Sequence, residues 1–377
     1  MKIGIDSIAF STSKYFLSLD VLAQQRNVDC EKYCFGIGQK KMSIFPPNED
    51  IVTIAIDAAQ KILSQIENKK DIDMLIFATE SSFDISKSAG IYIHHFLGLK
   101  DDCRVFDVKQ ACYSATAALQ LAKAYVNSNH RSKVLIIGSD IVRYSPGTSG
   151  EPTQGGAAVA FIVSQNPRIL EIEPHFGAYT TDIMDFWRPI SMKEALFDGK
   201  LSAHNYLKSL EICTKRYFEK SNLAISDVDH VCFHAPFGKM ARKANNQLLK
   251  SKTIEETLIY NSIIGNSCSA SLYVSFISLM DNFKCDFSKK RICFFSYGSG
   301  SVAEFFSGII SENYKKMLKA EEHQTMLSQR IEISFSEYES LHSNDFNDFS
   351  AYQNVGNVIL SGIVDNKRIY VSMEDNN

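Results

Sequence analysis

The sequence predicts an α/β protein made of two similar halves. Short apolar runs such as "MLIFA", "VLIIG" and "ICFFS" are typical of strands buried on both faces of a sheet. Helical stretches alternate with these runs, which indicates βαβ units and largely parallel sheets. The order strand–helix–strand–helix–strand occurs twice along the chain. We therefore predict one half over residues 1–165 and a second over 166–377, with a C-terminal extension from about residue 312.

The first half carries these elements in a clear order. "DMLIFATESS" predicts a buried strand that ends in polar residues, "SAGIYIHHFLGL" a helix, and "CRVFDV" a second strand. From Cys112 onward, small and apolar side chains recur at helical spacing, which predicts a helix packed into a core. "SKVLIIGSD" predicts the third strand.

The second half repeats the same order. "VDHVCFHAPFGKM" predicts a strand that runs into a polar turn and "ARKANNQLLKS" a helix. "IYNSIIGN" occupies the place of the next strand, "SASLYVSFISLMDN" predicts a buried helix, and "KRICFFSYGSGS" predicts the last strand. Cys112 follows Glu80 by 32 positions, and Asn266 follows His234 by 32 positions, so the two pairs occupy equivalent places in the two halves.

Composition excludes several classes of protein. The 377 residues are 45% hydrophobic and 22% charged, as expected of a globular domain with a large core. A net charge of −3 argues against nucleic acid or an anionic membrane as the main partner. Residues 257–280 carry no charge but too many polar groups for a lipid-facing span. Nine cysteines without a CxxC pair, and a strand-like start, predict a reduced cytoplasmic protein.

Four chemically capable residues follow predicted strands. Ligands of parallel sheets bind beyond the carboxyl ends of the strands, where Glu80, Cys112, His234 and Asn266 all lie. A cysteine, a carboxylate and a histidine in one pocket are typical of acyl transfer through a thioester. At a helix start, we expect the Cys112 thiolate to be stabilised. We expect its amide and one from the glycine loop 296–301 to hold the oxyanion.

Each of these residues also has a structural interpretation. Cys112 could be a small buried hydrophobe, His234 a core histidine, Glu80 a helix cap and the glycine loop a tight turn. The symmetric placement of four such residues in a duplicated chain favours the functional interpretation.

A set of motifs across most of the chain resembles the 3-hydroxy-3-methylglutaryl-CoA synthase family of the thiolase superfamily. The motifs are "ATES", "QACYSAT", "GEPTQGGAAVA", "DFWRP", "DGKLS", "HAPFGKMARKA", the "GN" at 265–266 and "FSYGSGS". The resemblance implies a thiolase-like duplicated fold with five layers, αβαβα, and a homodimer. It implies condensation of acetyl-CoA with acetoacetyl-CoA through an acetyl-cysteine, in the mevalonate pathway, with no metal and no cofactor.

The resemblance also implies a role for each matching residue. Cys112 matches the acylated nucleophile, Glu80 the general acid/base, and His234 the residue that orients and polarises the acetoacetyl group. Other positions match substrate contacts: Asp29, Tyr144, Thr153, Ser202, Lys239, Lys243, Asn266 and Ser299. The family commonly has a tyrosine two residues after the matching asparagine, where this chain has Cys268.

Three alternatives remain open at the level of sequence. "KSAGIYIHHFLGLKDDCRVFDVKQACYS" resembles the branch that condenses acyl groups on acyl-carrier protein during polyketide β-branching, which would make a carrier protein a partner. "FGIGQKKMSIFPPNEDIV" resembles the mevalonate branch more closely. A type III ketoacyl synthase would need no carboxylate at the position of Glu80, and the intact set of Glu80, Cys112 and His234 weighs against an inactive CoA-binding protein.

Overall fold

The computed structural model describes residues 2–248, 253–343, 349, 352 and 356–373. Its largest sheet has nine strands in the order β11-β12-β13-β8-β1-β7-β6-β4-β5. The first half supplies β1 (Ile3–Ser11), β4 (Ile72–Ala78), β5 (Arg104–Val108), β6 (Lys133–Val142) and β7 (Gly155–Gln165). The second half supplies β8 (Leu170–Thr180), β11 (His230–Phe233), β12 (Arg291–Gly298) and β13 (Val302–Ile310).

Two pairs of residues join the strands of the two halves into this sheet. Gly4 lies opposite Glu171, and Ile5 lies opposite Leu170, in antiparallel register. Gly4 has no room for a side chain, because a Cβ there would lie 1.9 Å from the Leu170 carbonyl oxygen. Within this nine-stranded sheet, the other strands of each half pair only with strands of the same half.

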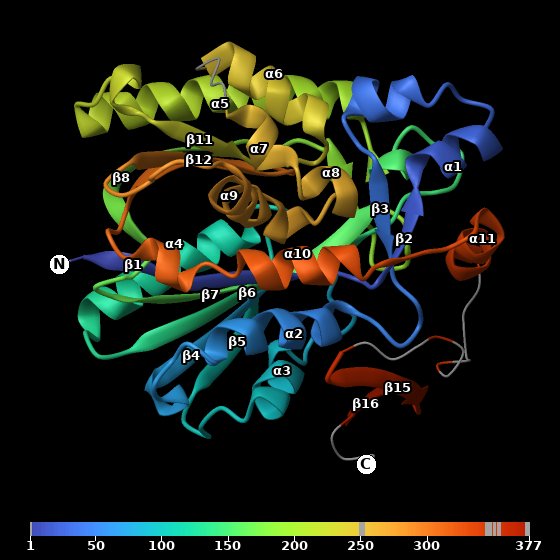
Figure 1. Cartoon of the computed structure of the whole chain (residues 1–377), viewed down its shortest axis with the longest axis horizontal. Coiled ribbons are helices and arrows are strands. Elements are labelled where there is room, and N and C mark those ends of the chain that lie inside the picture. The colour runs from blue at the N-terminus through green and yellow to red at the C-terminus, as the bar shows by residue number, and fades with distance from the viewer. Residues whose placement is uncertain (1, 249–252, 344–348, 350–351, 353–355, 374–377) are drawn as a thin grey trace.

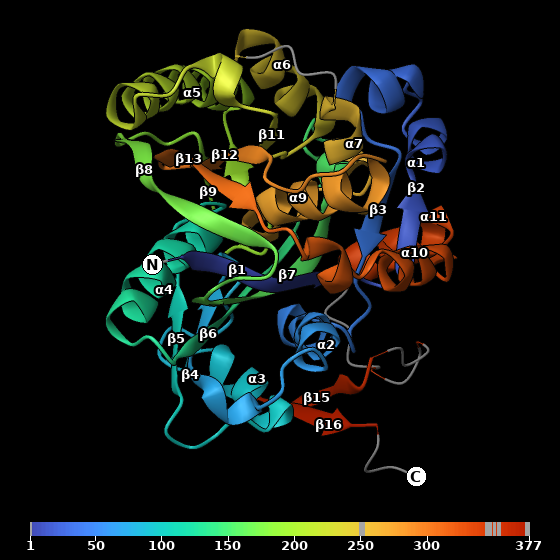
Figure 2. The same cartoon turned by 60° about the vertical axis from the view of Figure 1, so that its left-hand side comes forward.

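Helices fill the space between the two sets of strands and cover both outer faces (Figures 1 and 2). The two central helices are α4 (Ser114–Ser128) and α9 (Ser271–Asn282). The outer helices are α2 (Ile51–Leu63) and α3 (Gly90–Leu97) on the first half, and α5 (Gly199–Ser221) and α6 (Gly238–Leu248) on the second. This order of layers confirms the predicted αβαβα fold.

The largest hydrophobic core lies around the two central helices. Leu119 of α4 and Phe276 of α9 are fully buried there with Ile76 of β4, Phe161 of β7 and Phe294 of β12. Every residue of α9 from Ser271 to Met280 is buried, as the uncharged sequence indicates. Among the described residues, none of the helices combines the length and the apolar character that a membrane crossing requires.

The prediction of largely parallel sheets is only partly right. The outer pairs β4–β5, β4–β6 and β11–β12 are parallel, whereas β6–β7, β1–β7, β12–β13 and β8–β13 are antiparallel. The chain passes from β6 to β7 and from β12 to β13 without a crossover helix, which lets these consecutive strands pair in antiparallel orientation.

The prediction of a strand over "IYNSIIGN" is wrong. Residues 261–264 form the short helix α8 (Asn261–Ile264), so the second half contributes four strands to the sheet where the first contributes five. The polar groups of this segment find partners outside the sheet. The Asn261 side chain donates to Ser275 Oγ of α9, and the Asn261 carbonyl accepts from the Gln39 side chain.

Smaller elements surround this body. They are β2 (Tyr15–Ser18), α1 (Leu19–Gln25), η1 (Lys32–Ile37), β3 (Lys41–Ile44), η2 (Lys69–Asp71), η3 (Glu151–Thr153), β9 (Phe186–Trp187), β10 (Leu196–Phe197), η4 (Ile225–Asp227), α7 (Ile254–Leu258) and η5 (Cys268–Ala270). After β13 come η6 (Tyr314–Met317), α10 (Ala320–Ser328), β14 (Ile331–Glu332), α11 (Phe335–Ser343), β15 (Val358–Val364) and β16 (Lys367–Ser372). The strands β14, β2 and β3 form a separate sheet, so the C-terminal part pairs with the N-terminal part.

Candidate active site

A cavity of about 490 Å³ is lined by segments of both halves. The residues that line it come from η1, the turn before α4, the β6–β7 connection, α5, the turn after β11, α6 and the ends of α8 and β12. They include Cys112, Tyr144, Thr153, Ser202, His234, Lys239, Lys243, Asn266 and Ser299, all of which the sequence predicts as site residues. Of the two pairs related by the 32-residue spacing, Cys112, His234 and Asn266 line this cavity, whereas Glu80 does not line it.

Glu80 and Cys112 lie next to each other beside a second cysteine. Glu80 follows β4, Cys112 lies in the turn before α4, and Cys268 belongs to η5. One carboxylate oxygen of Glu80 and the sulfur atoms of Cys112 and Cys268 all lie within 4.8 Å of one another. The two sulfur atoms are 2.7 Å apart.

The glycine loop after β12 packs closely against the Cys112 turn. A Cβ at Gly298 would lie 2.5 Å from the Gln110 carbonyl oxygen, so only glycine allows this approach. The Gln110 side chain in turn donates to the Ser299 carbonyl oxygen at 3.1 Å. The loop 296–301 therefore lies directly against the turn that carries Cys112, as an oxyanion site shared by the two segments would require.

Burial changes the protonation of Glu80. Desolvation by burial, together with the nearby charge of Asp140, raises the pKa of the Glu80 carboxyl to about 7. Hydrogen bonding from Cys268 and the charge of Arg188 oppose this shift in pKa. A carboxyl group with a pKa near neutrality can both accept and return a proton, as general acid–base catalysis requires.

Asp140, which the sequence analysis did not select, organises this part of the site. It is fully buried at the end of β6. Its Oδ1 accepts from the Glu80 amide at 2.8 Å and from Thr79 Oγ1 at 2.9 Å, and its Oδ2 accepts from the Ser269 amide at 3.0 Å. Asp140 thus ties the Glu80 segment to η5. An acidic residue at the end of the apolar run "VLIIGSD" is the signal that could have revealed it.

The prediction of a stabilised Cys112 thiolate is wrong for the protein without substrate. The hydrogen bond with Cys268 lowers the pKa of Cys112, but desolvation and the charges of Glu80, Asp140 and Asp185 outweigh it and raise the pKa to about 11. The helix α4 begins at Ser114, so Cys112 precedes its first turn. Burial and nearby carboxylates both disfavour the charged thiolate, which is why the pKa is raised.

His234 is a neutral imidazole at the end of β11. Only 2% of it is exposed, and desolvation lowers its pKa to about 3. Its amide donates to the Phe295 carbonyl oxygen at 2.8 Å, and its carbonyl accepts from the Tyr206 hydroxyl at 2.6 Å. A neutral imidazole held in this way can donate a hydrogen bond to a substrate oxygen without titrating near neutral pH.

The remaining predicted residues occupy different depths. Asn266 lies deep in the cavity wall, where its side chain accepts from the Cys268 amide at 2.9 Å. Lys239 and Lys243 are exposed on α6 at one edge of the cavity, as their spacing predicts. Asp29 is exposed between α1 and η1, accepts from the Glu31 amide, and does not line the cavity.

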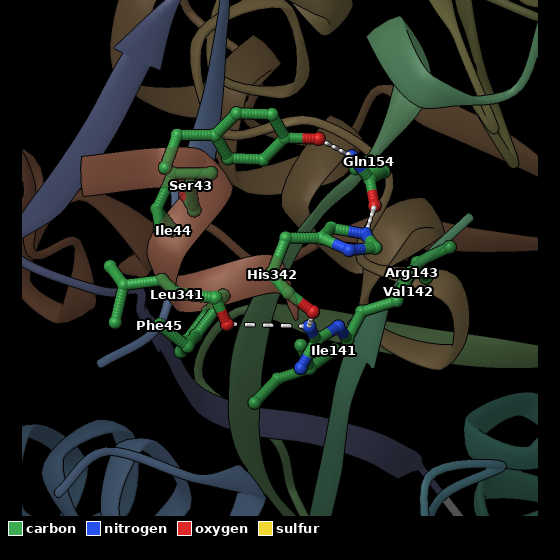
Figure 3. A pocket seen from close by; sticks show the side chains of 10 residues that line it. Ser43, Ile44, Phe45, Ile141, Val142, Arg143, Gln154, Leu341 and His342 are labelled. Carbon is green, nitrogen blue, oxygen red and sulfur yellow. Dashed lines mark hydrogen bonds between the residues drawn. The ribbon is translucent and has the colours of Figure 1, made fainter. Parts of the chain in front are cut away.

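The helix α11 contacts the segment that carries Tyr144 and lines a second, smaller cavity (Figure 3). The Nε2 atom of His342 lies 2.9 Å from the Tyr144 carbonyl oxygen, and Arg143 donates to the His342 carbonyl oxygen at 2.8 Å. The Gln154 side chain accepts from the Tyr144 amide and donates to the Tyr338 hydroxyl. The sequence analysis missed this support, which carries no recognisable motif.

The buried carboxylate of Glu151 is paired with the guanidinium group of Arg26. Its carboxylate is 1% exposed and accepts from Arg26 Nε at 3.1 Å and Arg26 Nη2 at 2.8 Å. We expect Arg26→Met to lower the free energy of unfolding by about 3 kcal/mol, because it leaves a buried carboxylate without its counter-charge. Urea denaturation measures this, and the double variant with Glu151→Gln should recover part of the loss. An Arg26→Met variant as stable as wild type would contradict the dependence.

Comparison with known proteins gives a consistent result over the length of the chain. Residues 1–167 match the family described as hydroxymethylglutaryl-coenzyme A synthase N terminal, and residues 171–253 and 245–350 match its C terminal counterpart. The hydroxymethylglutaryl-CoA synthase of Enterococcus faecalis is 41% identical over 351 residues, which cover 90% of this chain and 91% of that protein.

A second relative and a solved structure extend the comparison. The polyketide biosynthesis 3-hydroxy-3-methylglutaryl-ACP synthase PksG of Bacillus subtilis is 33% identical over 369 residues, covering 90% of this chain and 87% of that one. A crystal structure of an HMG-CoA synthase complexed with CoA superimposes with a TM-score of 0.94 at 36% identity, covering 99% and 100% of the two chains.

Proposed function

Because this chain belongs to the hydroxymethylglutaryl-CoA synthase family, we propose that it condenses acetyl-CoA with acetoacetyl-CoA and water to form 3-hydroxy-3-methylglutaryl-CoA and free CoA. The observation that carries this proposal is that Cys112 and His234 line one cavity, with a Glu80 carboxylate oxygen within 4.8 Å of the Cys112 sulfur. These residues come from both halves of the chain. Family membership also sets aside the type III ketoacyl synthase as an alternative.

The first step forms the acetyl-enzyme. Cys112 Sγ attacks the carbonyl carbon of acetyl-CoA, the bond from that carbon to the CoA sulfur breaks, and CoA leaves with a proton. The amide of Cys112 and an amide of the loop 296–301 face the developing oxyanion in this proposal. A neighbouring base must receive the thiol proton, since the pKa of Cys112 is about 11.

The second step forms the carbon–carbon bond. Glu80 removes a proton from the methyl group of the acetyl thioester, and the resulting enolate attacks the ketone of acetoacetyl-CoA. The neutral imidazole of His234 donates a hydrogen bond to the ketone oxygen as it gains charge. The new alkoxide then takes the proton that Glu80 removed from the methyl group, which forms the hydroxyl group and returns Glu80 to its carboxylate form. Water then hydrolyses the thioester bond to Cys112, which releases 3-hydroxy-3-methylglutaryl-CoA and makes the overall condensation effectively one-way.

We further propose the setting in which this reaction takes place. The enzyme acts in the cytoplasm, in the mevalonate pathway, as a homodimer, and needs neither metal nor cofactor. The greater identity to the Enterococcus faecalis enzyme than to PksG supports CoA as the acceptor carrier. The specific alternative is condensation on acyl-carrier protein in polyketide β-branching, which the similarity to PksG supports.

Steady-state turnover with the two acceptors tests the proposed function. We expect acetyl-CoA and acetoacetyl-CoA to give product, and acetoacetyl-acyl-carrier protein to react at least about tenfold more slowly in kcat/KM. The reverse preference would establish the polyketide alternative. Absence of product and of CoA release with either acceptor would indicate an inactive binding protein.

The exposed lysines on α6 provide a matched test of CoA recognition. In the proposal, Lys239 and Lys243 contact the CoA phosphates, so the double alanine variant should raise the KM for acetoacetyl-CoA about tenfold with little change in kcat. The KM effect should diminish at high salt. Lys215→Ala, an exposed lysine of α5 outside the cavity, is the control. An unchanged KM in the double variant would remove these lysines from CoA binding.

A further inference from the structure

Cys268 is a thiol in the site with no role in the steps described so far. It is fully buried, and its sulfur lies 2.7 Å from the sulfur of the nucleophile Cys112. A carboxylate oxygen of Glu80 lies within 4.8 Å of both sulfur atoms. Of these three groups, the carboxylate is the one that is ionised most readily near neutral pH and can therefore accept a proton.

The chemistry of the first step requires a route for the Cys112 proton. A thiol attacks a thioester as its thiolate, and burial near the carboxylates of Glu80, Asp140 and Asp185 disfavours the Cys112 thiolate in the free enzyme. The proton must therefore leave as the sulfur attacks. Cys268 is in direct contact with Cys112, and its sulfur lies within 4.8 Å of a Glu80 carboxylate oxygen. A hydrogen bond from Cys268 is also one of the interactions that lower the pKa of that carboxyl.

We propose that the Cys268 thiol relays the proton of Cys112 to the Glu80 carboxylate during acyl transfer. The Cys112 proton passes to Cys268 Sγ while the proton of Cys268 passes to Glu80, and Cys112 Sγ bonds to the acetyl carbon. The carbon–sulfur bond to CoA breaks, and the departing CoA sulfur takes the proton from Glu80. Glu80 is then a carboxylate again, ready to remove the methyl proton in the next step. This inference rests on the proposed function.

The fold holds Cys268 in place for this task. Cys268 has a φ of +45°, in the left-handed region that a non-glycine residue seldom adopts. Its amide donates to the Asn266 side chain at 2.9 Å, and the next residue, Ser269, donates through its amide to Asp140 at 3.0 Å. The same Asp140 carboxylate accepts from the Glu80 amide at 2.8 Å. One buried carboxylate therefore positions both Cys268, the middle of the relay, and Glu80, its acceptor end.

The rate of acetylation as a function of pH tests the relay. Rapid mixing with acetyl-CoA, acid quenching and intact-protein mass spectrometry give this rate for wild type, Cys268→Ala and Cys268→Ser. We expect Cys268→Ala to acetylate about 10²-fold more slowly at neutral pH. Its rate should keep rising with hydroxide concentration above the pH at which wild type levels off. Cys268→Ser should restore most of the rate, because a hydroxyl group can also donate and accept.

A structural role alone would give a different pattern. It would lower the Cys268→Ala rate by the same factor at every pH, and that result would overturn the proposal, as would a rate equal to that of wild type. Cys213→Ala, which truncates a buried thiol of α5, controls for the loss of a buried sulfur. Lack of condensation by wild type would instead contradict the proposed function.

Discussion

Replacing Cys112 with serine should abolish both the acetyl-enzyme and product formation. A serine hydroxyl is a far weaker nucleophile than a thiolate, and Glu80 is too weak a base to ionise it, so we expect turnover to fall by at least about 10⁴-fold. Intact-protein mass spectrometry after incubation with acetyl-CoA measures the adduct directly. Cys30→Ser, which changes an exposed cysteine before η1, should keep the full adduct.

The loss in Cys112→Ser should not come from unfolding. Cysteine and serine are nearly equal in shape, and Cys112 is only partly buried at the cavity. We therefore expect the free energy of unfolding to change by no more than about 1 kcal/mol, as measured by urea denaturation. An acetyl adduct of undiminished yield on the serine variant would show that another residue is the nucleophile.

The sequence predicted the site better than it predicted the details of the fold. The ends of β4 and β11 are buried apolar runs followed by polar residues, and that local pattern was enough to locate Glu80 and His234. The strand predicted over "IYNSIIGN" failed because its polar groups bond to α9 and to Gln39, and no local pattern reveals such partners.

The chemical state of the site could not be predicted from spacing. The pKa of Cys112 depends on carboxylates that the chain brings in from Glu80, Asp140 and Asp185, and a helix start alone gave the wrong direction. The contact between Cys112 and Cys268 joins residues 156 positions apart. The support of Tyr144 by His342 is likewise a long-range contact between residues 198 positions apart. These properties arise only when the two halves pack together.

The second large effect is expected at Glu80. The variant Glu80→Gln keeps the shape of the side chain but cannot accept a proton. Acetylation should still reach its final level, more slowly, because the relay from Cys112 loses its base. Condensation should fall by about 10³-fold, because the methyl proton of the acetyl group has no acceptor. Separate measurement of acetyl-enzyme and product distinguishes the two steps, and product formation at the wild-type rate would exclude Glu80 from the mechanism.

The pH dependence of condensation gives an independent check on Glu80. Its carboxyl must be ionised to accept the methyl proton, and its pKa of about 7 predicts that kcat/KM falls about tenfold for each unit below neutral pH. His234 adds no titration in this range, since its pKa is about 3. The acidic limb should therefore be absent from the residual activity of Glu80→Gln. An acidic limb that survives in this variant would assign the titration to another group.

The raised pKa of Glu80 also predicts that rising pH lowers the stability of wild type while it raises the activity. The folded protein holds the Glu80 proton more tightly than the unfolded chain does. The free energy of unfolding of wild type is therefore highest below the pKa that Glu80 has in the unfolded chain, and it falls as pH rises through about 7. Glu80→Gln does not ionise and escapes this loss. We expect the free energy of unfolding of Glu80→Gln, relative to that of wild type, to be larger at about pH 8 than at about pH 5 by on the order of 2 kcal/mol. Urea denaturation at both pH values measures the difference. The same difference between the two proteins at both pH values would mean that Glu80 has the same pKa in the folded protein as in the unfolded chain. The active site would then hold no base tuned to neutral pH.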